Sequence, residues 1–274
     1  MKTAILAGGL GTRLMEETTL RPKPMVEIGG RPILRHLMHF YANQGYNDFV
    51  VAAGYKADHI KDYFRNLRLM AGDLRIEMAT GNVEVASRAN LDWNVRIVDT
   101  GELTMTGGRL LRLKPDLGTE TFMLTYGDGL SDVDIDALIG LHRSHGKIAT
   151  LTAVRPPTAQ RTLALDGERV ASIHSDDGLD TYINGGFFVF EPGIFDYLSA
   201  DSDSLEQDAL PRVAADGSLM AYHHDGFWQC MDTVQERDVL EGLWNAGRAP
   251  WLRAGRTAET NKDNSRFSNG ALAG

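Results

Sequence analysis

Cysteine is almost absent from the sequence: Cys230 is the only one among 274 residues. One thiol excludes an internal disulfide framework and is typical of a protein in a reducing cytoplasm. The sequence also lacks any apolar run near the roughly 20 residues that span a bilayer. Its first apolar run, residues 3–7, reaches glycine too early for the core of a signal peptide. We therefore expect a cytoplasmic protein with no membrane partner.

Positive charge is scarce, with 28 Lys and Arg residues against 37 Asp and Glu residues and a net charge of -9. An acidic chain is a poor general binder of nucleic acid or of anionic membranes, so neither is an expected partner. If the ligand is an anion, positive charge has to be concentrated locally or supplied by a metal ion. Hydrophobic residues make up 43% of the chain, which excludes a disordered or fibrous protein.

The first 155 residues alternate apolar runs typical of strands with segments of helical period. One such helix is expected over residues 32–44, where Pro32 takes a favoured first position. This alternation predicts an α/β protein with a mainly parallel sheet and helices on both faces. The expected strands are residues 3–7, 48–53, 95–98, 121–125 and 149–154, and the other expected helices are residues 57–67 and 133–145.

After Pro156 and Pro157 the pattern changes to short strands separated by turns, with two later helices. Residues 253–274 are polar and have no apolar period, so we expect a flexible tail or a segment that docks on a neighbouring subunit. Trp244 and Trp251 fit either a subunit contact in a homo-oligomer or the core, and the sequence leaves both open. The expected strands are residues 163–165, 170–173 and 182–190, and the expected helices are residues 205–215 and 234–244.

A glycine-rich segment, Leu6-Ala7-Gly8-Gly9-Leu10-Gly11-Thr12-Arg13-Leu14, directly follows the first expected strand. Glycines let backbone N–H groups approach an anion, and successive N–H groups in such a turn form an anion-binding nest. Arg13 adds a planar cation suited to phosphate oxygens. The segment is neither a Walker A motif nor Gly-x-Gly-x-x-Gly. By itself it also fits a tight turn between a strand and a helix.

A second segment, Arg21-Pro22-Lys23-Pro24, follows shortly after. Its prolines exclude helix and hold Lys23 on an extended stretch of chain. Together the two segments resemble the N-terminal signature of the sugar-1-phosphate nucleotidylyltransferases. Within that family the sequence is most similar to the glucose-1-phosphate cytidylyltransferases, over roughly residues 1–251. The stretches that carry this similarity are residues 23–30, 93–95, 99–101, 105–109, 125–129, 183–188, 226–229 and 231–233.

The resemblance implies a Rossmann-like nucleotide-diphospho-sugar transferase fold, with a mixed, mainly parallel central sheet and a smaller β-rich sugar-binding part. It implies one domain over residues 1–252, in which residues 1–155 bind the nucleotide and residues 156–252 bind the sugar. The implied reaction transfers a nucleotidyl group, with CTP as the favoured donor, to a hexose 1-phosphate and releases pyrophosphate and an NDP-sugar. The implied cofactor is Mg²⁺ or Mn²⁺.

Two aspartates are the candidate metal ligands. Asp128 follows an expected strand and has glycines on both sides, at the edge of the sheet where open α/β proteins bind ligands. Asp232 follows another short apolar segment. Mg²⁺ favours carboxylate oxygens together with phosphate oxygens and waters. From the residues alone, Asp128 also fits the cap of a turn and Asp232 the cap of a helix beginning near Val234. The resemblance implies that both aspartates hold the catalytic metal.

The resemblance also implies roles for the other site residues. Arg13, Lys23 and Asp128 are the expected catalytic residues, because Arg13 and Lys23 would neutralise phosphate charge and Asp128 would hold the metal. The expected sugar-binding residues are Tyr126, Asn184, Gly185 and Glu206. The expected nucleotide-binding residues are Leu6, Ala7, Gly8, Gly9, Gly11, Thr12, Thr106, Gly107, Gly108 and Arg109.

The sequence departs from the resembling family where the sugar phosphate binds. In that family the lysine of a Glu-Lys-Pro motif grips this phosphate, whereas residues 172–178 here read Ser-Ile-His-Ser-Asp-Asp-Gly. Losing a charge-assisted hydrogen bond costs about 1.5–3 kcal/mol, so the contact has to be rebuilt, with Arg155 or Arg161 as candidates, or is not needed. Cys230 stands where the family has proline, and it fits a packed side chain better than a nucleophile.

Two alternatives to the transferase follow from this departure. The first is an enzyme that receives a preformed NDP-sugar and isomerises it between pyranose and furanose, as a metal-dependent mutase. The second is a non-catalytic NDP-sugar-binding module, against which the retention of both cations and both metal carboxylates argues. The acid or base of the mutase would come from His174, His223, His224 or Asp176.

Overall fold

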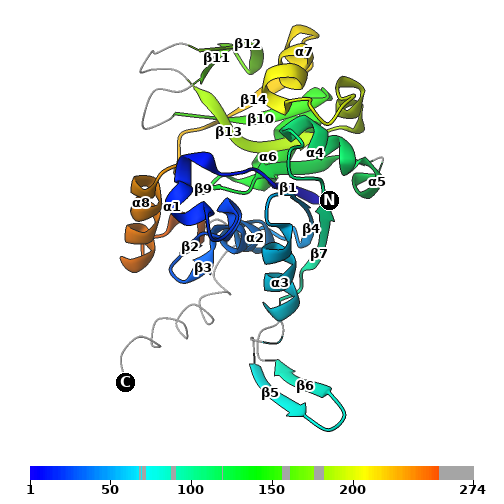
Figure 1. The fold of residues 1–274 in the computed structure, drawn as a ribbon. Helices are drawn as coiled ribbons and strands as arrows, with labels where there is room; N and C mark the ends of the chain where they lie inside the picture. The colour runs from blue at the N-terminus through cyan, green and yellow to red at the C-terminus, as the bar shows by residue number, and fades with distance from the viewer. Residues whose placement is uncertain are drawn as a thin grey trace.

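The computed structural model describes residues 1–67, 69, 72–87, 91–118, 120–155, 161–175 and 182–252 (Figure 1). These residues contain a nine-stranded sheet with the order β11-β12-β14-β10-β13-β8-β1-β4-β7. Its strands are β1 (Thr3–Ala7), β4 (Asp48–Ala53), β7 (Asn94–Asp99), β8 (Phe122–Tyr126), β10 (Ala149–Val154), β11 (Arg161–Asp166), β12 (Arg169–Ser175), β13 (Ile183–Phe190) and β14 (Leu219–His224).

The sheet is parallel in the half built by the first part of the chain. Strand β1 pairs in parallel with β4 and β8, and β4 pairs in parallel with β7. Strand β13 is antiparallel to both β8 and β10, and β11, β12 and β14 also form antiparallel pairs. Strand β14 pairs in parallel with β10, so four of the eight neighbouring pairs in this sheet are parallel and four are antiparallel. The predicted mixed α/β sheet is therefore confirmed, and its continuous parallel part is the half that contains β8, β1, β4 and β7.

Helices cover both faces of the sheet, as the alternating pattern predicts. Ile5 and Val51 point to one face, where they share a core with side chains of α2 and α6. Ala4 and Val50 point to the other face, with side chains of α4 and α7. The helices are α1 (Met15–Thr18), α2 (Ile33–Asn43), α3 (Ala57–Leu67), α4 (Thr106–Arg112), α5 (Lys114–Leu117), α6 (Ile135–His145), α7 (Leu210–Ala215) and α8 (Val234–Asn245).

Short helical turns complete the described chain. The single helix expected over residues 205–215 is wrong in its first half, because Leu205–Ala209 forms a π-helix, η5, before α7 begins. Ser204 caps η5 by accepting a hydrogen bond from the Gln207 N–H at 3.1 Å. The 3-10 turns are η1 (Thr12–Leu14), η2 (Lys23–Met25), η4 (Pro192–Tyr197) and η6 (Pro250–Leu252).

Three small two-stranded sheets lie beside the main sheet. They pair β2 (Glu27–Ile28) with β3 (Arg31–Pro32), β5 (Gly72–Glu77) with β6 (Asn82–Ser87), and β9 (Gly129–Ser131) with β15 (Trp228–Cys230). The β5–β6 hairpin, which the sequence pattern did not predict, projects from the body beyond α3 (Figure 1). The β9–β15 pair matters for the site, because its end places the Met231 N–H on the Asp128 carbonyl oxygen at 2.9 Å.

Trp251 belongs to the core. Its side chain is fully buried, and its indole N–H donates to His36 Nδ1 of α2 at 3.3 Å. Trp244 packs edge-on against the same imidazole, with 4.9 Å between ring centroids. Of the two roles that the sequence left open for Trp251, the core role is therefore the one observed. The expected tail, residues 253–274, lies outside the described residues.

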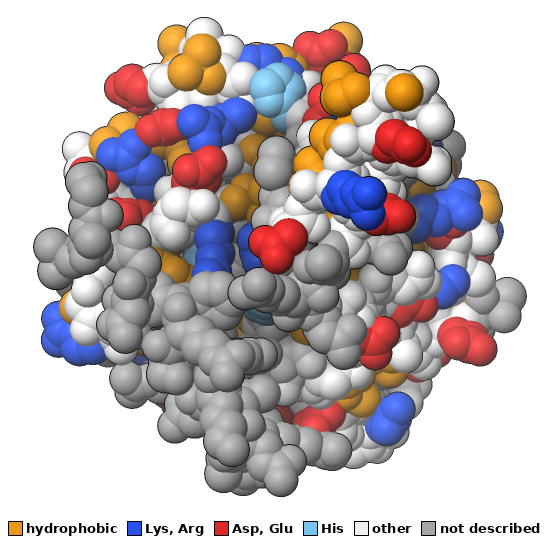
Figure 2. Space-filling model, turned by 90° about the horizontal axis from the view of Figure 1, so that it is seen from below, with side chains coloured by type: hydrophobic (Ala, Val, Ile, Leu, Met, Phe, Trp, Pro, Cys, Tyr) orange, Lys and Arg blue, Asp and Glu red, His pale blue; other side chains and the backbone are white. Residues whose placement is uncertain are grey.

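Charged side chains of both signs are interspersed over the face shown in Figure 2. Among the described residues in that view, no broad basic patch is visible. In the described part of the chain, every helix is too short or too polar to cross a bilayer.

Candidate active site

A cavity of about 870 Å³ opens at the carboxyl ends of β1 and β8, beside the start of β13. Open α/β sheets bind ligands at this edge. Of the site residues expected from the sequence, all except Gly107 and Gly108 line the cavity. These two glycines pack instead against the backbone at Asp201 and Asp203, and the Gly108 N–H donates to the Asp203 carbonyl oxygen at 3.0 Å. In the structure both glycines therefore have a packing role, and their contact with the nucleotide stays a prediction.

The glycine-rich segment curls over one end of the cavity. Gly11 has φ of 65°, a left-handed conformation that favours glycine, and its carbonyl oxygen accepts from the Leu14 N–H at 3.0 Å to close η1. A Cβ at Gly11 would also lie 2.7 Å from Thr18 Cγ2. The segment is thus a tight turn that lines the cavity, and its binding of an anion stays a prediction.

Arg109 is buried beneath this segment and bonds to the protein. Its guanidinium donates to the carbonyl oxygen of Gly8 at 2.8 Å and to that of Gly101 at 2.7 Å. It also donates to Thr100 Oγ1 at 2.7 Å and to the Glu102 carbonyl oxygen at 3.1 Å. Burial, followed by the charge of Arg112, lowers the pKa of Arg109. Arg109 therefore fastens the glycine segment to the loop after β7, although its side chain reaches the cavity wall.

Lys23 stands between the two candidate metal ligands. Its Nζ donates to Asp128 Oδ2 at 2.6 Å and to Asp232 Oδ1. Arg13 Nη1 lies 2.8 Å from the second oxygen of Asp232. Burial alone would lower the pKa of Lys23, but Asp128 and Asp232 outweigh burial, so the net shift is upward and the ammonium stays charged. The structure thus brings together the expected cations and carboxylates in one cluster.

Asp232 does not cap helix α8, so that alternative is wrong. The N-cap is Thr233, whose Oγ1 accepts from the Glu236 N–H at 3.3 Å. Glu236 Oε2 in turn accepts from the backbone N–H groups of Thr233 at 2.8 Å and of Asp232 at 2.7 Å. Because the capping box uses Thr233 and Glu236, the Asp232 carboxylate is left to face Lys23 and Arg13.

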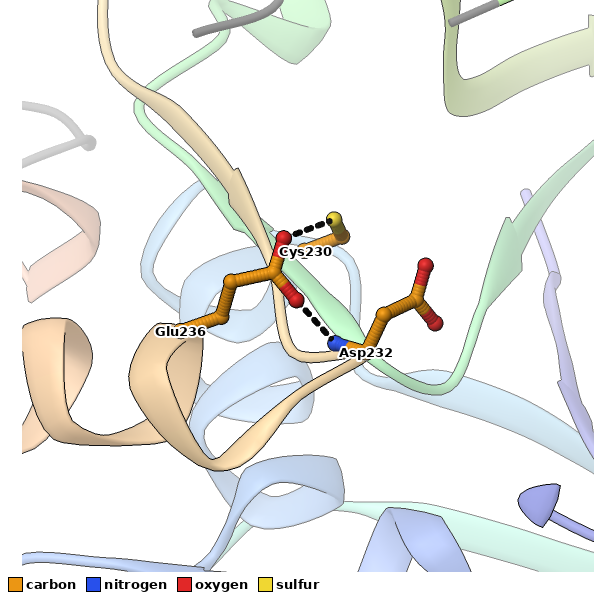
Figure 3. A group of neighbouring side chains, drawn as sticks. All are labelled: Cys230, Asp232 and Glu236. Carbon is orange, nitrogen blue, oxygen red and sulfur yellow. Dashed lines mark hydrogen bonds between the residues drawn. The ribbon is translucent and has the colours of Figure 1, made fainter. Parts of the chain in front are cut away.

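Cys230, Asp232 and Glu236 form a second acidic cluster close enough to suggest a metal (Figure 3). The donor set does not suit one. Both Glu236 oxygens are engaged, one by the capping box and one by the Cys230 thiol at 3.4 Å. Burial, with Asp232 and Glu236 adding to it, raises the pKa of Cys230 to about 12. The Cys230 thiol is buried and donates to Glu236, and the capping box holds the other Glu236 oxygen, so we read this group as a packed helix start and keep Asp128 and Asp232 as the candidate metal pair.

Another part of the cavity wall holds a group of hydrogen-bonded polar side chains around Glu206. The Tyr126 hydroxyl donates to Glu206 Oε1 at 2.5 Å and accepts from Asn184 Nδ2 at 3.3 Å. Thr106 Oγ1 donates to Glu206 Oε2 at 2.6 Å. Burial and the nearby Glu206 raise the pKa of Tyr126, so its phenol stays a hydrogen-bond donor. A fixed carboxylate, a phenol and an amide are groups that bind hydroxyls.

Trp228 is a wall residue that sequence reasoning missed. Its indole N–H donates to the Gly185 carbonyl oxygen at 2.7 Å. The similarity to the family included residues 226–229, which was the available signal, but no chemistry singled out a tryptophan there. Gly186 beside it has φ of 79° and packs on the Tyr126 ring, where a Cβ would clash.

The histidines considered as an acid or base lie away from the cavity wall in the described residues. His224 Nε2 lies 3.0 Å from Asp132 Oδ1, and the His223 ring stacks edge-on against Tyr182 with 4.7 Å between centroids. Arg155, a candidate for the lost phosphate contact, lies over the Tyr182 ring at 4.7 Å and near Asp225 at 3.5 Å. Asp176 and the side chains of Arg161 and His174 lie outside what the structure describes.

A loop that can hold phosphates, a cluster that can hold a cation and a polar end that can hold hydroxyls define a nucleotide-transferring class of α/β enzyme. Residues 2–242 match the nucleotidyl transferase family, and the chain belongs to that family. The resemblance read from the sequence is confirmed, and the chain is a nucleotidyltransferase.

Two relatives are similar over almost their whole length. The chain is 49% identical over 253 residues to glucose-1-phosphate cytidylyltransferase of Salmonella typhi, covering 92% of this chain and 98% of the relative. It is 38% identical over 252 residues to the probable glucose-1-phosphate cytidylyltransferase of Bacillus subtilis, covering 92% and 99%. The solved structure of HddC from Yersinia pseudotuberculosis has a TM-score of 0.73 at 23% identity, covering 89% and 99%, and so shares the fold.

Proposed function

We propose that the enzyme transfers the cytidylyl group of CTP to a hexose 1-phosphate, with glucose 1-phosphate as the favoured acceptor. The observation that carries this proposal is the Lys23–Asp128–Asp232 cluster, which shares one cavity with the glycine-rich segment and with Glu206. The names of the relatives at 49% and 38% identity support the choice of base and sugar.

The cofactor is proposed to be Mg²⁺ or Mn²⁺, held by Asp128 and Asp232. Two carboxylates with space for phosphate oxygens suit a hard divalent cation. When bound, such an ion offsets negative charge on the phosphates and polarises them.

In the proposed reaction, an oxygen of the sugar phosphate attacks the α-phosphorus of the nucleotide. A P–O bond forms there, the bond to the bridging oxygen of the β-phosphate breaks, and pyrophosphate leaves with that oxygen. Backbone N–H groups around Gly9 orient the triphosphate, and the charges of Arg13 and Lys23 offset the charge that builds up on it. No proton transfer to a side chain is needed.

The sugar is proposed to bind at the end of the cavity formed by Tyr126, Asn184 and Glu206. Tyr126 comes from the part of the chain assigned to the nucleotide, residues 1–155, and Glu206 from the part assigned to the sugar, residues 156–252. Their 2.5 Å hydrogen bond supports one domain in which both parts complete one site.

The test is a set of incubations of the purified chain with Mg²⁺. CTP, UTP, GTP or dTTP is supplied with glucose 1-phosphate, and pyrophosphate is measured. We expect release that requires glucose 1-phosphate and is fastest with CTP. In parallel, preformed NDP-sugars are supplied and the products are separated by chromatography. An isomer formed without pyrophosphate would favour the mutase, and binding of NDP-sugars without turnover would favour the non-catalytic module; either result would contradict the proposal.

The cytoplasmic location and a homo-oligomer also remain proposals. The single cysteine supports the first. For the second, Leu74, Ile76 and Val83 on the β5–β6 hairpin are about half exposed, at 46%, 48% and 50%. The strand register places Ile76 opposite Val83, and Leu74 lies two residues along the same face. Two copies of this apolar face would pack without burying charge. Sedimentation of the wild type, compared with that of Ile76→Lys, would test whether this face holds a homo-oligomer together.

A further inference from the structure

Lys23 contacts both of the carboxylates that would hold a divalent cation. Its ammonium contacts one oxygen of Asp128 at 2.6 Å and one oxygen of Asp232, the two carboxylates assigned to the metal. Arg13 contacts the second oxygen of Asp232 at 2.8 Å. Both carboxylates are therefore neutralised by cations that belong to the chain.

The two cations differ in how firmly they are held. The Lys23 side chain is only 10% exposed, whereas that of Arg13 is 74% exposed. The Lys23 backbone is fixed between an extended Pro22 and the turn η2, which closes through a hydrogen bond from the Val26 N–H to the Lys23 carbonyl oxygen at 3.0 Å. Arg13 can swing into solvent at little cost. Lys23 can leave the carboxylates only if another acceptor within reach takes over its hydrogen bonds.

A bound triphosphate supplies the acceptors that Lys23 needs and the further ligands that the ion needs. Its oxygens can accept the hydrogen bonds of the Lys23 ammonium, and they can complete the ligands of an ion that has only two carboxylates from the protein. We propose that Lys23 makes metal binding depend on the nucleotide, so that the Asp128–Asp232 pair takes up a divalent cation together with a triphosphate and excludes the ion alone. This inference rests on the metal role of the two aspartates proposed above.

Titration of the full chain with Mn²⁺ alone, with unbound Mn²⁺ followed by its electron paramagnetic resonance signal, tests the inference. Lys23→Met keeps the apolar stem and removes the charge. Because a fixed positive charge at this distance repels a divalent ion, we expect this variant to bind Mn²⁺ at least about ten-fold more tightly than the wild type. Arg13→Met is the matched control, since it removes a charge from the same carboxylate at the exposed rim, and its gain should stay below about three-fold.

Equal Mn²⁺ affinity in the wild type and Lys23→Met would overturn the inference, and so would an equal gain in Arg13→Met. The double variant Lys23→Met with Asp128→Asn separates this failure from a failure of the metal site. If the double variant loses the increase in Mn²⁺ affinity, the ion binds at the Asp128–Asp232 pair. If it keeps the increase, the ion binds elsewhere and the proposed metal role is wrong.

A second measurement needs no variant and covers the case in which Lys23→Met does not fold. The midpoint of thermal unfolding of the wild type is measured with Mn²⁺, with CTP, and with both. Ligands raise the midpoint only if they bind the folded state. We expect a rise with both together that exceeds the sum of the separate rises. A rise with Mn²⁺ alone as large as that with both would contradict the inference.

Discussion

At the scale of the residue, Arg109 shows that a charged side chain on a cavity wall can hold backbone segments together. It lies 3% exposed and donates to carbonyl oxygens at Gly8, Gly101 and Glu102. These carbonyl groups belong to the glycine-rich segment and to the loop after β7. The Gly8 carbonyl oxygen also accepts from the Tyr55 N–H at 3.1 Å, so loss of the guanidinium would leave it with one donor of two and would remove the link to Gly101 and Glu102. We infer that Arg109 sets the position of the backbone that meets the nucleotide.

Arg109→Met is expected to destabilise the fold by about 3 kcal/mol, because it removes the charge-assisted hydrogen bonds to three carbonyl oxygens and to Thr100 Oγ1. It should also raise the KM for CTP, since the glycine-rich segment loses its support. Urea unfolding and steady-state kinetics measure the two effects. The control is Arg112→Met on the same helix. Arg112 bonds to the exposed Asp201 at 2.8 Å, so its loss should change neither quantity appreciably. Similar unfolding curves for both variants would refute the role of Arg109.

Glu206 allows a separate test of the sugar end. Its carboxylate accepts from the Tyr126 and Thr106 hydroxyls and from Ser204 Oγ at 2.9 Å, so its position is fixed before any ligand binds. Glu206→Gln keeps the shape and removes the charge. We expect kcat/KM for glucose 1-phosphate to fall about ten-fold or more, with the KM for CTP within about two-fold of the wild type. A larger effect on CTP than on the sugar would place Glu206 on the nucleotide side instead.

At the scale of the element, regular periodicity predicted the strands β1, β4 and β10 and the helix α3 with the bounds observed. Helix α4 was missed as a helix because it begins Thr106-Gly107-Gly108, and paired glycines are typical of loops. These glycines are helical because the backbone at Asp201 and Asp203 passes directly against them. The signal for α4 thus lies about a hundred residues further along the chain, where no local pattern reports it. The candidate metal pair was predicted for a different reason, since family motifs pointed to Asp128 and Asp232 and spacing did not.

Gly108→Ala tests this packing. Alanine favours helix over glycine, but its Cβ would clash with the Asp201 backbone, so we expect a loss of at least about 2 kcal/mol of stability. Gly140→Ala in α6 is the matched control, because a Cβ there meets no atom within 4 Å among the described residues. The control should gain about 0.5–1 kcal/mol. Chemical denaturation of both variants gives the comparison, and a stabilised Gly108→Ala would show that α4 does not pack as described.

At the scale of the whole molecule, folding keeps several histidines neutral. Burial, offset in part by a hydrogen bond to the Ile28 carbonyl oxygen, lowers the pKa of His36 from 6.5 to about 4. Burial also lowers the pKa of His39 to about 3 and that of His145 to about 4. In each case the unfolded chain binds the proton more readily than the folded one. His36 has a further reason to stay neutral, because its Nδ1 accepts from the Trp251 indole N–H. Protonation would place an N–H on Nδ1 that points at the indole N–H.

Stability is therefore expected to be fully developed above pH 6.5 and to decline as the pH falls from 6.5 towards 4. Urea unfolding at a series of pH values between 7 and 4.5 measures the decline. His36→Gln should reduce the slope of the unfolding free energy against pH by up to the contribution of one proton. The stability that the variant itself loses at pH 7 is subtracted first. Constant stability over this range would show that these histidines titrate alike in the folded and unfolded chain.

The contacts between the two ends of the described chain set a condition on how the enzyme is made. Lys23 meets Asp232, the Gly29 N–H meets Glu241 at 2.7 Å, and His36 meets Trp251. These contacts join the first 40 residues to the last 25 described. During synthesis on the ribosome, the early strands can pair while the later chain is still missing, but the catalytic cluster cannot form until Asp232 has emerged. A nascent chain halted before that residue could still pair Lys23 with Asp128 but would lack the carboxylate that also contacts Arg13, so the full cluster forms only after Asp232 has been made.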